Sequence, residues 1–403
     1  MKRLTIAVGL LALSCSLPAF GAESAAGGLE FSGNAVVLSG WQHDDSAALP
    51  IFGGEFALER GPMAPSRDTF QFYLDQIELD LDKSFGEKVR LRADLDFGRA
   101  LSGSIRSTEG SNFVVEQAYM TVGILGGELA VGRFNAPVGY YVVDRAFNPT
   151  ISFSNIYNYI TPTNVTGAKM YWAFNETIDL SVYIMNNMFD CLQLGGACQV
   201  GPRTPAPVSA QNTAFPNLAA PNEDSAIPSW GMRLGFNFGE GDRKSTVGIS
   251  YLGGPEQSTN AHLDNMIDMD FAIKPTDNLL LAGEFNYYQR NNLPGIVGPN
   301  AKFLGGLLVV DWQASDIWDM FFSYGYVQDF QGLVTGAKDQ IHNFVLGFGY
   351  QITDGAKFKM EYRMDMFLYA GFPGGSQAVF SPAPGADTTS LVNAVAGEFA
   401  YVF

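Results

Sequence analysis

Hydrophobic and polar residues alternate along much of this chain. In residues 89–97, apolar side chains at every second position are separated by Arg90, Arg92, Asp94 and Asp96. Residues 357–366 repeat the pattern, with Lys357, Lys359, Glu361, Arg363 and Asp365 between apolar neighbours. Successive side chains of a β-strand point to opposite faces. Each segment therefore predicts a strand with one apolar face and one charged face.

Similar segments recur from one end of the chain to the other. Counting them predicts about sixteen strands, at residues 29–42, 68–82, 88–98, 112–124, 127–135, 166–174, 177–187, 228–239, 243–253, 263–273, 278–290, 300–313, 317–329, 339–352, 356–368 and 389–403. Fourteen or eighteen strands would also be consistent with the pattern. The facing of the strands at 112–124 and 127–135 is ambiguous.

The connections between these segments alternate between short and long. Short turns such as 84–87, 240–242 and 353–355 are rich in Gly, Asp and Glu, whereas segments such as 136–165 and 188–227 are long. This rhythm is typical of a transmembrane antiparallel β-barrel with short periplasmic turns and long extracellular loops. Closure of such a barrel leaves no unpaired strand edge in lipid. We therefore expect an all-β fold in which residues 22–403 form a single outer-membrane barrel.

The beginning of the chain has the layout of a secretory signal peptide. Lys2 and Arg3 precede an apolar run at 4–17, followed by Pro18 and the small-residue site 19–21. This pattern predicts that residues 1–21 are cleaved in a Gram-negative cell. A lipid anchor at Cys15 is the alternative, although the residues before it lack the usual Leu. No later run of 18 apolar residues exists, which argues against a helical membrane protein.

The last strand carries a family signature. Phe399, Tyr401 and the terminal Phe403 occupy alternate positions, which resembles the C-terminal signature of bacterial outer-membrane proteins. Gly397 departs from that pattern because it is small rather than apolar. The resemblance implies location in the cell outer membrane, with Phe399, Tyr401 and Phe403 as the signal read by the barrel-assembly machinery. An ordinary edge strand that ends in Phe is the alternative.

Composition agrees with a membrane barrel and excludes one class of partner. The chain has 45 Gly, 31 Phe and 17 Tyr but only 16% charged residues, a mixture suited to strands, tight turns and interfacial aromatic belts. Its net charge is −17 at pH 7. Because nucleic-acid binding requires a basic surface, we expect no nucleic-acid partner.

The most distinctive local motif leaves one strand and opens a long loop. Residues 132–140 read Gly-Arg-Phe-Asn-Ala-Pro-Val-Gly-Tyr, which resembles the Pro-x-Gly-Tyr turn of the OmpL-like outer-membrane β-barrel porins, the family called putative β-barrel porin-2. Members often have an acid after the Gly-Tyr, whereas this chain has Tyr141 and delays its acid to Asp144. The loop at 136–165 either folds into the lumen and sets the pore size or forms an aromatic-rich outer loop.

Cysteines and histidines suggest few further sites. Cys191 and Cys198 lie close together in the longest loop of a chain bound for an oxidising compartment, which predicts a local disulfide. A metal-binding cysteine pair is the lesser alternative. His43, His262 and His342 fall at expected extracellular strand ends, where scattered surface histidines are the simpler interpretation than a metal site.

Acidic residues give no recognisable metal-binding motif. Asp264, Asp268 and Asp270 lack the Gly and terminal Glu of an EF-hand loop, and the last two are expected to face the lumen. No Walker loop, nucleotide fingerprint or G-x-S-x-G motif is present. We therefore expect no catalytic, cofactor-binding or metal-binding site and no enzyme.

The inward rows predict the function. A barrel of about sixteen strands leaves an aqueous channel, and charged inward rows favour a wet interior. The expected pore-lining residues are Glu78, Asp80, Arg90, Arg92, Asp94, Asp96, Arg133, Arg233, Asp268, Asp270, Glu284, Lys359, Glu361, Arg363 and Asp365. Since acids outnumber bases on these rows, we expect a weakly cation-selective porin for passive diffusion of small hydrophilic solutes and ions.

The expected partners follow from that function. They are outer-membrane lipid, the barrel-assembly machinery and small hydrophilic solutes or ions. A homotrimer is suggested by fold analogy alone. An outer-membrane binding protein or adhesin that acts through its long loops is the alternative function.

Overall fold

A computed structural model describes residues 28–44, 68–98, 113–186, 188, 227–240, 243–255, 263–291, 300–330, 339–369 and 389–403. The expected signal peptide at 1–21 and the cysteines Cys191 and Cys198 lie outside these residues, so the cleavage site and the disulfide stay predictions. His262 also lies outside them.

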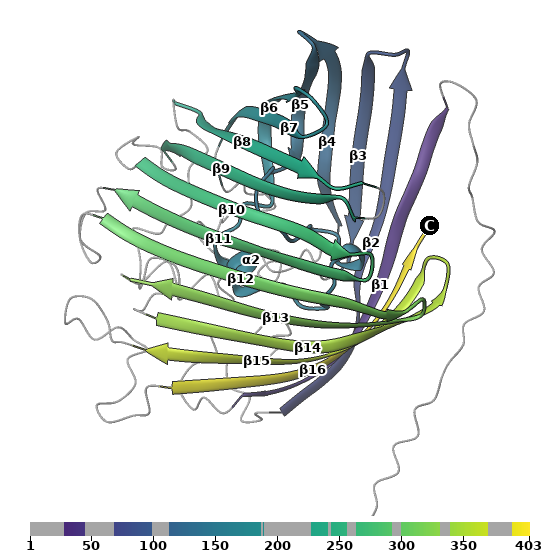
Figure 1. The fold of residues 1–403 in the computed structure, drawn as a ribbon, viewed down its shortest axis with the longest axis vertical. Helices are drawn as coiled ribbons and strands as arrows, with labels where there is room; N and C mark the ends of the chain where they lie inside the picture. The colour runs from purple at the N-terminus through teal and green to yellow at the C-terminus, as the bar shows by residue number, and fades with distance from the viewer. Residues whose placement is uncertain are drawn as a thin grey trace, which may run out of the picture.

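The described strands form one closed antiparallel barrel (Figure 1). Each strand pairs with its neighbours in sequence, and β1 pairs with β16. The strands are β1 (Leu29–Asp44), β2 (Asp68–Phe85), β3 (Val89–Phe97), β4 (Phe113–Ile124), β5 (Gly127–Asn135), β6 (Asn164–Ala173), β7 (Ile178–Met185), β8 (Ser229–Phe238), β9 (Ser245–Pro255), β10 (Leu263–Thr276), β11 (Leu279–Asn291), β12 (Asn300–Ser315), β13 (Trp318–Asp329), β14 (Asp339–Thr353), β15 (Ala356–Tyr369) and β16 (Thr389–Val402). The prediction of a sixteen-stranded all-β barrel is confirmed. No described helix is long and apolar enough to cross a membrane.

Strands β1 and β16 close the barrel. Their register runs from Asn34 opposite Val402 to Asp44 opposite Val392. Beyond β16, the backbone of Phe403 exchanges two hydrogen bonds with Gly33, at 3.1 and 3.0 Å. Because β1 is paired on both sides, neither terminal strand is left with an open edge.

The two faces of the wall differ as the alternation predicts. On the outer face, Trp230, Met360 and Phe399 are 43–47% exposed. On the inner face, Asp94 and Arg363 are at most 1% exposed. A closed barrel that presents an apolar outer face satisfies the backbone of every wall strand in lipid.

The segment 136–163, between β5 and β6, lies inside the barrel. It contains a short 3-10 helix, η1 (Arg145–Phe147), and a short α-helix, α2 (Asn155–Tyr159). Ser154 caps α2 by accepting a hydrogen bond from the Tyr157 N–H at 3.2 Å. The helix contacts β12 and β13 from within, and Figure 1 shows it inside the ring of strands. Of the two alternatives that the sequence left open, the structure has the inward fold.

An apolar cluster fills part of the interior around this segment. Phe153, Ile156, Tyr157 and Ile160 of the inner segment are at most 5% exposed. They belong to one cluster with inward-facing wall residues that include Phe303, Leu307, Val309 and Val327. In this region the interior is therefore apolar, because the segment packs against β12 and β13.

Candidate functional site

The Pro-Val-Gly-Tyr turn carries the segment 136–163, hereafter the inner loop, across the lumen. The N–H of Gly139 donates to Asp268 Oδ1 on β10 at 3.2 Å, and the N–H of Tyr140 donates to Glu284 Oε2 on β11 at 2.8 Å. Gly139 has φ +82°, and an added Cβ would lie 2.7 Å from Thr161 Cγ2. Glycine is therefore required for this turn to present its N–H groups to the opposite wall.

The middle of the inner loop is held by β15. Glu361 accepts hydrogen bonds from the N–H groups of Ile151 at 2.7 Å and Ser152 at 3.2 Å. Lys359 Nζ donates to the Asn148 carbonyl at 2.7 Å, and Arg363 donates to the Phe153 carbonyl at 2.6 Å. These charge-assisted bonds satisfy loop backbone groups that no water shell reaches, and such bonds are stronger than neutral ones.

A third attachment joins the inner loop to β2. Arg145 Nε lies 2.5 Å from Asp75 Oδ2, with both side chains at most 4% exposed. The same guanidinium lies 4.4 Å from the ring centre of Phe153. Beside it, burial raises the pKa of the Asp144 carboxyl, and the neighbouring carboxylate of Asp80 raises it further. The loop is thus fixed to several sectors of the wall rather than to one.

Most of the residues expected to line the pore do point inward, and the structure divides them by exposure. Those that are buried are Glu78, Asp94, Asp96, Asp268, Asp270, Glu284, Lys359, Glu361, Arg363 and Asp365. Those that keep some exposure on the inner wall are Asp80, Arg90, Arg92 and Arg233. Many of the buried ones bind the inner loop, so their charges meet loop backbone instead of bulk water.

Arg133 is a correction to the sequence analysis. It pairs with Ala118 and follows the same face of β5 as Val131, which is 47% exposed, whereas Phe134 next to it is buried inside. Its Nε donates to the Glu116 carbonyl at 3.0 Å. That carbonyl is available because the ladder between β3 and β4 shifts register between Asp94 and Leu95. Arg133 thus lies on the outer face, not in the lumen.

The partly exposed bases of the inner wall form ion pairs with acids of the same strand or of other strands. Arg90 pairs with Asp82, and Arg92 lies 2.8 Å from Asp94 and 3.3 Å from Asp80. On other strands, Arg233 NH2 lies 2.8 Å from Asp270 Oδ1 and Lys357 lies 2.7 Å from Asp319. The channel wall therefore carries interleaved acids and bases rather than a uniform acidic lining.

Sequence reasoning missed the loop side of this site. Ser152, Asn155 and Thr161 supply side-chain bonds to Glu361, Asp365 and Glu284, and nothing in local alternation identifies them. The sequence of one wall strand did indicate packing on its inner face. Residues 307–310 read Leu-Leu-Val-Val, and a strand that is apolar on both faces is typical of one buried on both faces.

The comparisons agree with this architecture. The family model described as "Putative beta-barrel porin-2, OmpL-like" matches residues 57–399. Comparison with curated proteins found no match.

Solved structures share the fold at low sequence identity. The anion-selective porin from Comamonas acidovorans is 9% identical, with a TM-score of 0.55 over 94% of this chain and 100% of that one. Outer-membrane expressed OmpT of Vibrio cholerae is 12% identical, with a TM-score of 0.53 over 95% of this chain and 99% of that one. OmpF of Salmonella typhi, solved with daunomycin, is 12% identical, with a TM-score of 0.53 over 93% and 97%.

A closed sixteen-stranded barrel with an apolar outer face, an inward-folded loop and a family match over most of its length identifies the chain as an outer-membrane protein. It belongs to the putative beta-barrel porin-2, OmpL-like family.

Proposed function

We propose that this protein is a non-enzymatic porin through which small hydrophilic solutes and ions cross the outer membrane by passive diffusion. The observation that carries the proposal is the inner loop, bound by charge-assisted hydrogen bonds to Asp268, Glu284 and Glu361 inside a closed barrel. A loop held in this way narrows the lumen of a sixteen-stranded barrel and leaves part of it open. Size exclusion is then set by the loop and by the wall charges that remain exposed.

We further propose weak cation selectivity. The charges of the inner wall that keep some exposure include the acids Asp80, Asp82, Asp179, Asp311 and Asp319 and the bases Arg90, Arg92, Lys169, Arg233, Lys274 and Lys357. These interleaved charges largely offset one another. A modest excess of negative charge would come from inward carboxylates that no base neutralises, and a low-dielectric wall focuses such a field into the water column. The Comamonas porin is named as anion-selective, but 9% identity supports a shared fold and not shared wall charges.

Reversal potentials in a KCl gradient across planar bilayers test this proposal. We expect a small preference for K⁺ at low salt that fades toward 1 M salt, where the Debye length is ~3 Å. Replacing both Arg90 and Arg92 with Ala should raise the preference, and replacing both Asp80 and Asp82 with Asn should lower it. Anion preference at low salt, or no response to either double substitution, would show that these rows do not line the conducting path.

The remaining associations are also proposals. The apolar outer face would contact outer-membrane lipid, and the last strand, with Phe399, Tyr401 and Phe403, would be read by the barrel-assembly machinery. One of the solved OmpT structures from Vibrio cholerae is described as a trimer form, and a homotrimer is the assembly we propose here. We also propose that the mature chain begins after Gly21 and carries a disulfide between Cys191 and Cys198. Native mass spectrometry would measure the number of chains in the assembly. Intact-mass analysis without reductant would show the cleavage site and the disulfide.

A further inference from the structure

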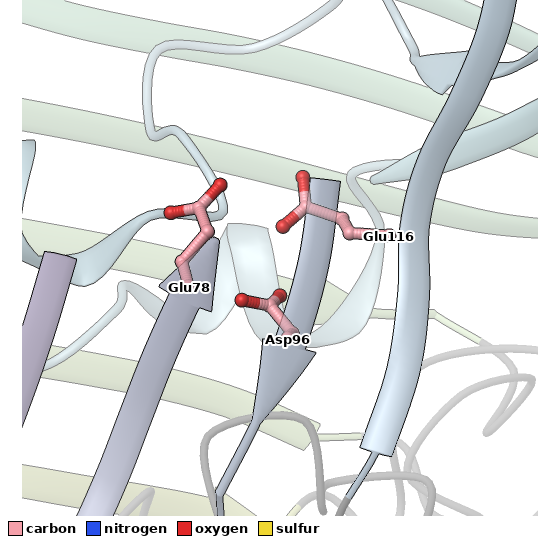
Figure 2. A group of neighbouring side chains, drawn as sticks. All are labelled: Glu78, Asp96 and Glu116. Atoms are coloured by element: carbon pink, nitrogen blue, oxygen red, sulfur yellow. The ribbon is translucent and has the colours of Figure 1, made fainter. Parts of the chain in front are cut away.

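Three carboxylates converge on the inner wall close to the inner loop. Glu78 of β2, Asp96 of β3 and Glu116 of β4 are each at most 1% exposed. One oxygen of each lies within 4.8 Å of the corresponding oxygens of the other two. Figure 2 shows the three carboxylate groups turned toward one another from adjacent strands. We call Glu78, Asp96 and Glu116 the carboxylate triad.

Strand register brings the triad together. Glu78 lies directly opposite Asp96 in the ladder between β2 and β3. The register shift between β3 and β4 leaves Glu116 and Gln117, which are adjacent in sequence, both buried. Like charges directly opposite each other in a sheet are destabilising. The arrangement therefore costs free energy unless something neutralises it.

The neighbouring pair of acids provides an internal comparison. Asp80 and Asp94 are also directly opposite each other in the same ladder. There, Arg92 lies 2.8 Å from Asp94 and 3.3 Å from Asp80 and so neutralises the pair. Within the described part of the chain, no Lys or Arg forms an ion pair with a member of the triad. Among the described residues, the triad thus lacks a cation like the Arg92 guanidinium that neutralises Asp80 and Asp94.

Oxygens of the triad are left without hydrogen-bond donors. Both carboxylate oxygens of Glu116 and Oδ2 of Asp96 are buried and accept no hydrogen bond of ordinary geometry, although the Asn135 side chain lies close to Glu116. Amides cover part of the rest: Gln76 Nε2 donates to Asp96 Oδ1 at 3.2 Å, and Asn34 donates to Glu78. Buried charges are normally paired or bound to metal. The three unpartnered oxygens point to a positively charged ligand.

We propose that the carboxylate triad binds a calcium ion. Ca²⁺ takes six to eight oxygen ligands at about 2.3–2.6 Å, so ligands on opposite sides of it are roughly 4.6–5.2 Å apart. The triad oxygens, all within 4.8 Å of one another, can reach a single ion of this size. Mg²⁺ requires a tighter and more regular octahedron and dehydrates reluctantly, so it fits less well.

The inner loop supplies a further acid beside the triad. Asp144 lies against Glu78, and its buried Oδ1 has no hydrogen-bond partner. A cation at the triad would therefore attract this part of the loop to β2, next to the ion pair between Arg145 and Asp75. The site does not depend on whether the barrel conducts.

Calorimetric titration tests the site directly. The full barrel, folded in detergent and freed of metal with EDTA, is titrated with CaCl₂ at pH 7.5. We expect one Ca²⁺ per chain and weaker binding of Mg²⁺. Replacing Asp96 with Asn or Glu116 with Gln should weaken Ca²⁺ binding at least about tenfold, because each removes a charged ligand while keeping side-chain volume.

The control is an inward-facing acid outside the triad. Asp311 of β12 also has a buried oxygen without a partner, and Asp311→Asn should leave the affinity for Ca²⁺ unchanged. Folding of every variant is verified by heat-modifiable migration. If Glu116→Gln does not fold, the Ca²⁺ affinity of Asp96→Asn tests the proposal. No heat of binding from the wild-type barrel up to millimolar CaCl₂ would overturn the proposal and leave shared protons as the explanation. Equal binding by wild type and triad variants, or equal weakening by Asp311→Asn, would overturn it as well.

Discussion

Individual residues on the inner wall act as anchors for the inner loop. The alternation of β15 was enough to predict that Lys359, Glu361 and Arg363 point inward, because strand geometry fixes facing wherever the outer row is apolar. It was not enough to predict what they bind. Their partners, such as the Ser152 N–H, lie about two hundred residues away in sequence, and no local pattern encodes that distance. The inward facing predicted for Arg133 was wrong because neither face of β5 is uniformly apolar, so the sequence does not show which face is the outer one.

Removing the Glu361 anchor should loosen the inner loop. Glu361→Ala leaves the N–H groups of Ile151 and Ser152 without acceptors, at a cost of about 1–3 kcal/mol for each buried unsatisfied group. We expect a larger and noisier single-channel conductance while the barrel still folds. Asp179→Ala is the matched control, since Asp179 is also an inward acid but accepts its hydrogen bond from Asn237 of the wall. Equal conductance changes in the two variants would indicate a general charge effect and not loop release.

Whole strands were the most predictable level of this protein. Apolar outward rows recur because lipid requires them, so the sequence locates strands such as β3 and β13 to within a residue or two. The inner loop was harder to predict, because aromatic side chains suit both a packed interior and a membrane interface. The triad could not be predicted either. Glu78, Asp96 and Glu116 meet only through the register of β2 to β4 and a bulge.

The closing strand should depend on its last residue. Deleting Phe403 removes two backbone hydrogen bonds to Gly33 and an outward ring that stacks with Tyr401. We expect a smaller fraction of heat-modifiable, folded barrel after refolding into detergent. Phe85→Ala is the control, because Phe85 is an aromatic of similar exposure, 55% against 51% for Phe403, on a strand that does not close the barrel. Equal folded fractions would contradict a special role for Phe403.

At the scale of the whole molecule, the closed wall and the inner loop have different roles. The strands of the wall close on themselves and satisfy their backbone in lipid, whereas the inner loop occupies part of the interior. Ile156 of α2 is fully buried in the apolar cluster between loop and wall, while Val142 of the same loop is 44% exposed. A charge at Ile156 is therefore expected to expel α2 from the cluster, because an unpaired buried carboxylate costs several kcal/mol or more.

Single-channel recording of wild type, Ile156→Asp and Val142→Asp in planar bilayers tests the central claim most directly. Each folded protein should give discrete conductance steps, since neither substitution replaces a residue of the wall. The steps of Ile156→Asp should be clearly larger than those of wild type, and the steps of Val142→Asp should match wild type. The absence of steps from folded wild-type protein would contradict the channel, and equal steps in all three would contradict a lumen narrowed by the inner loop.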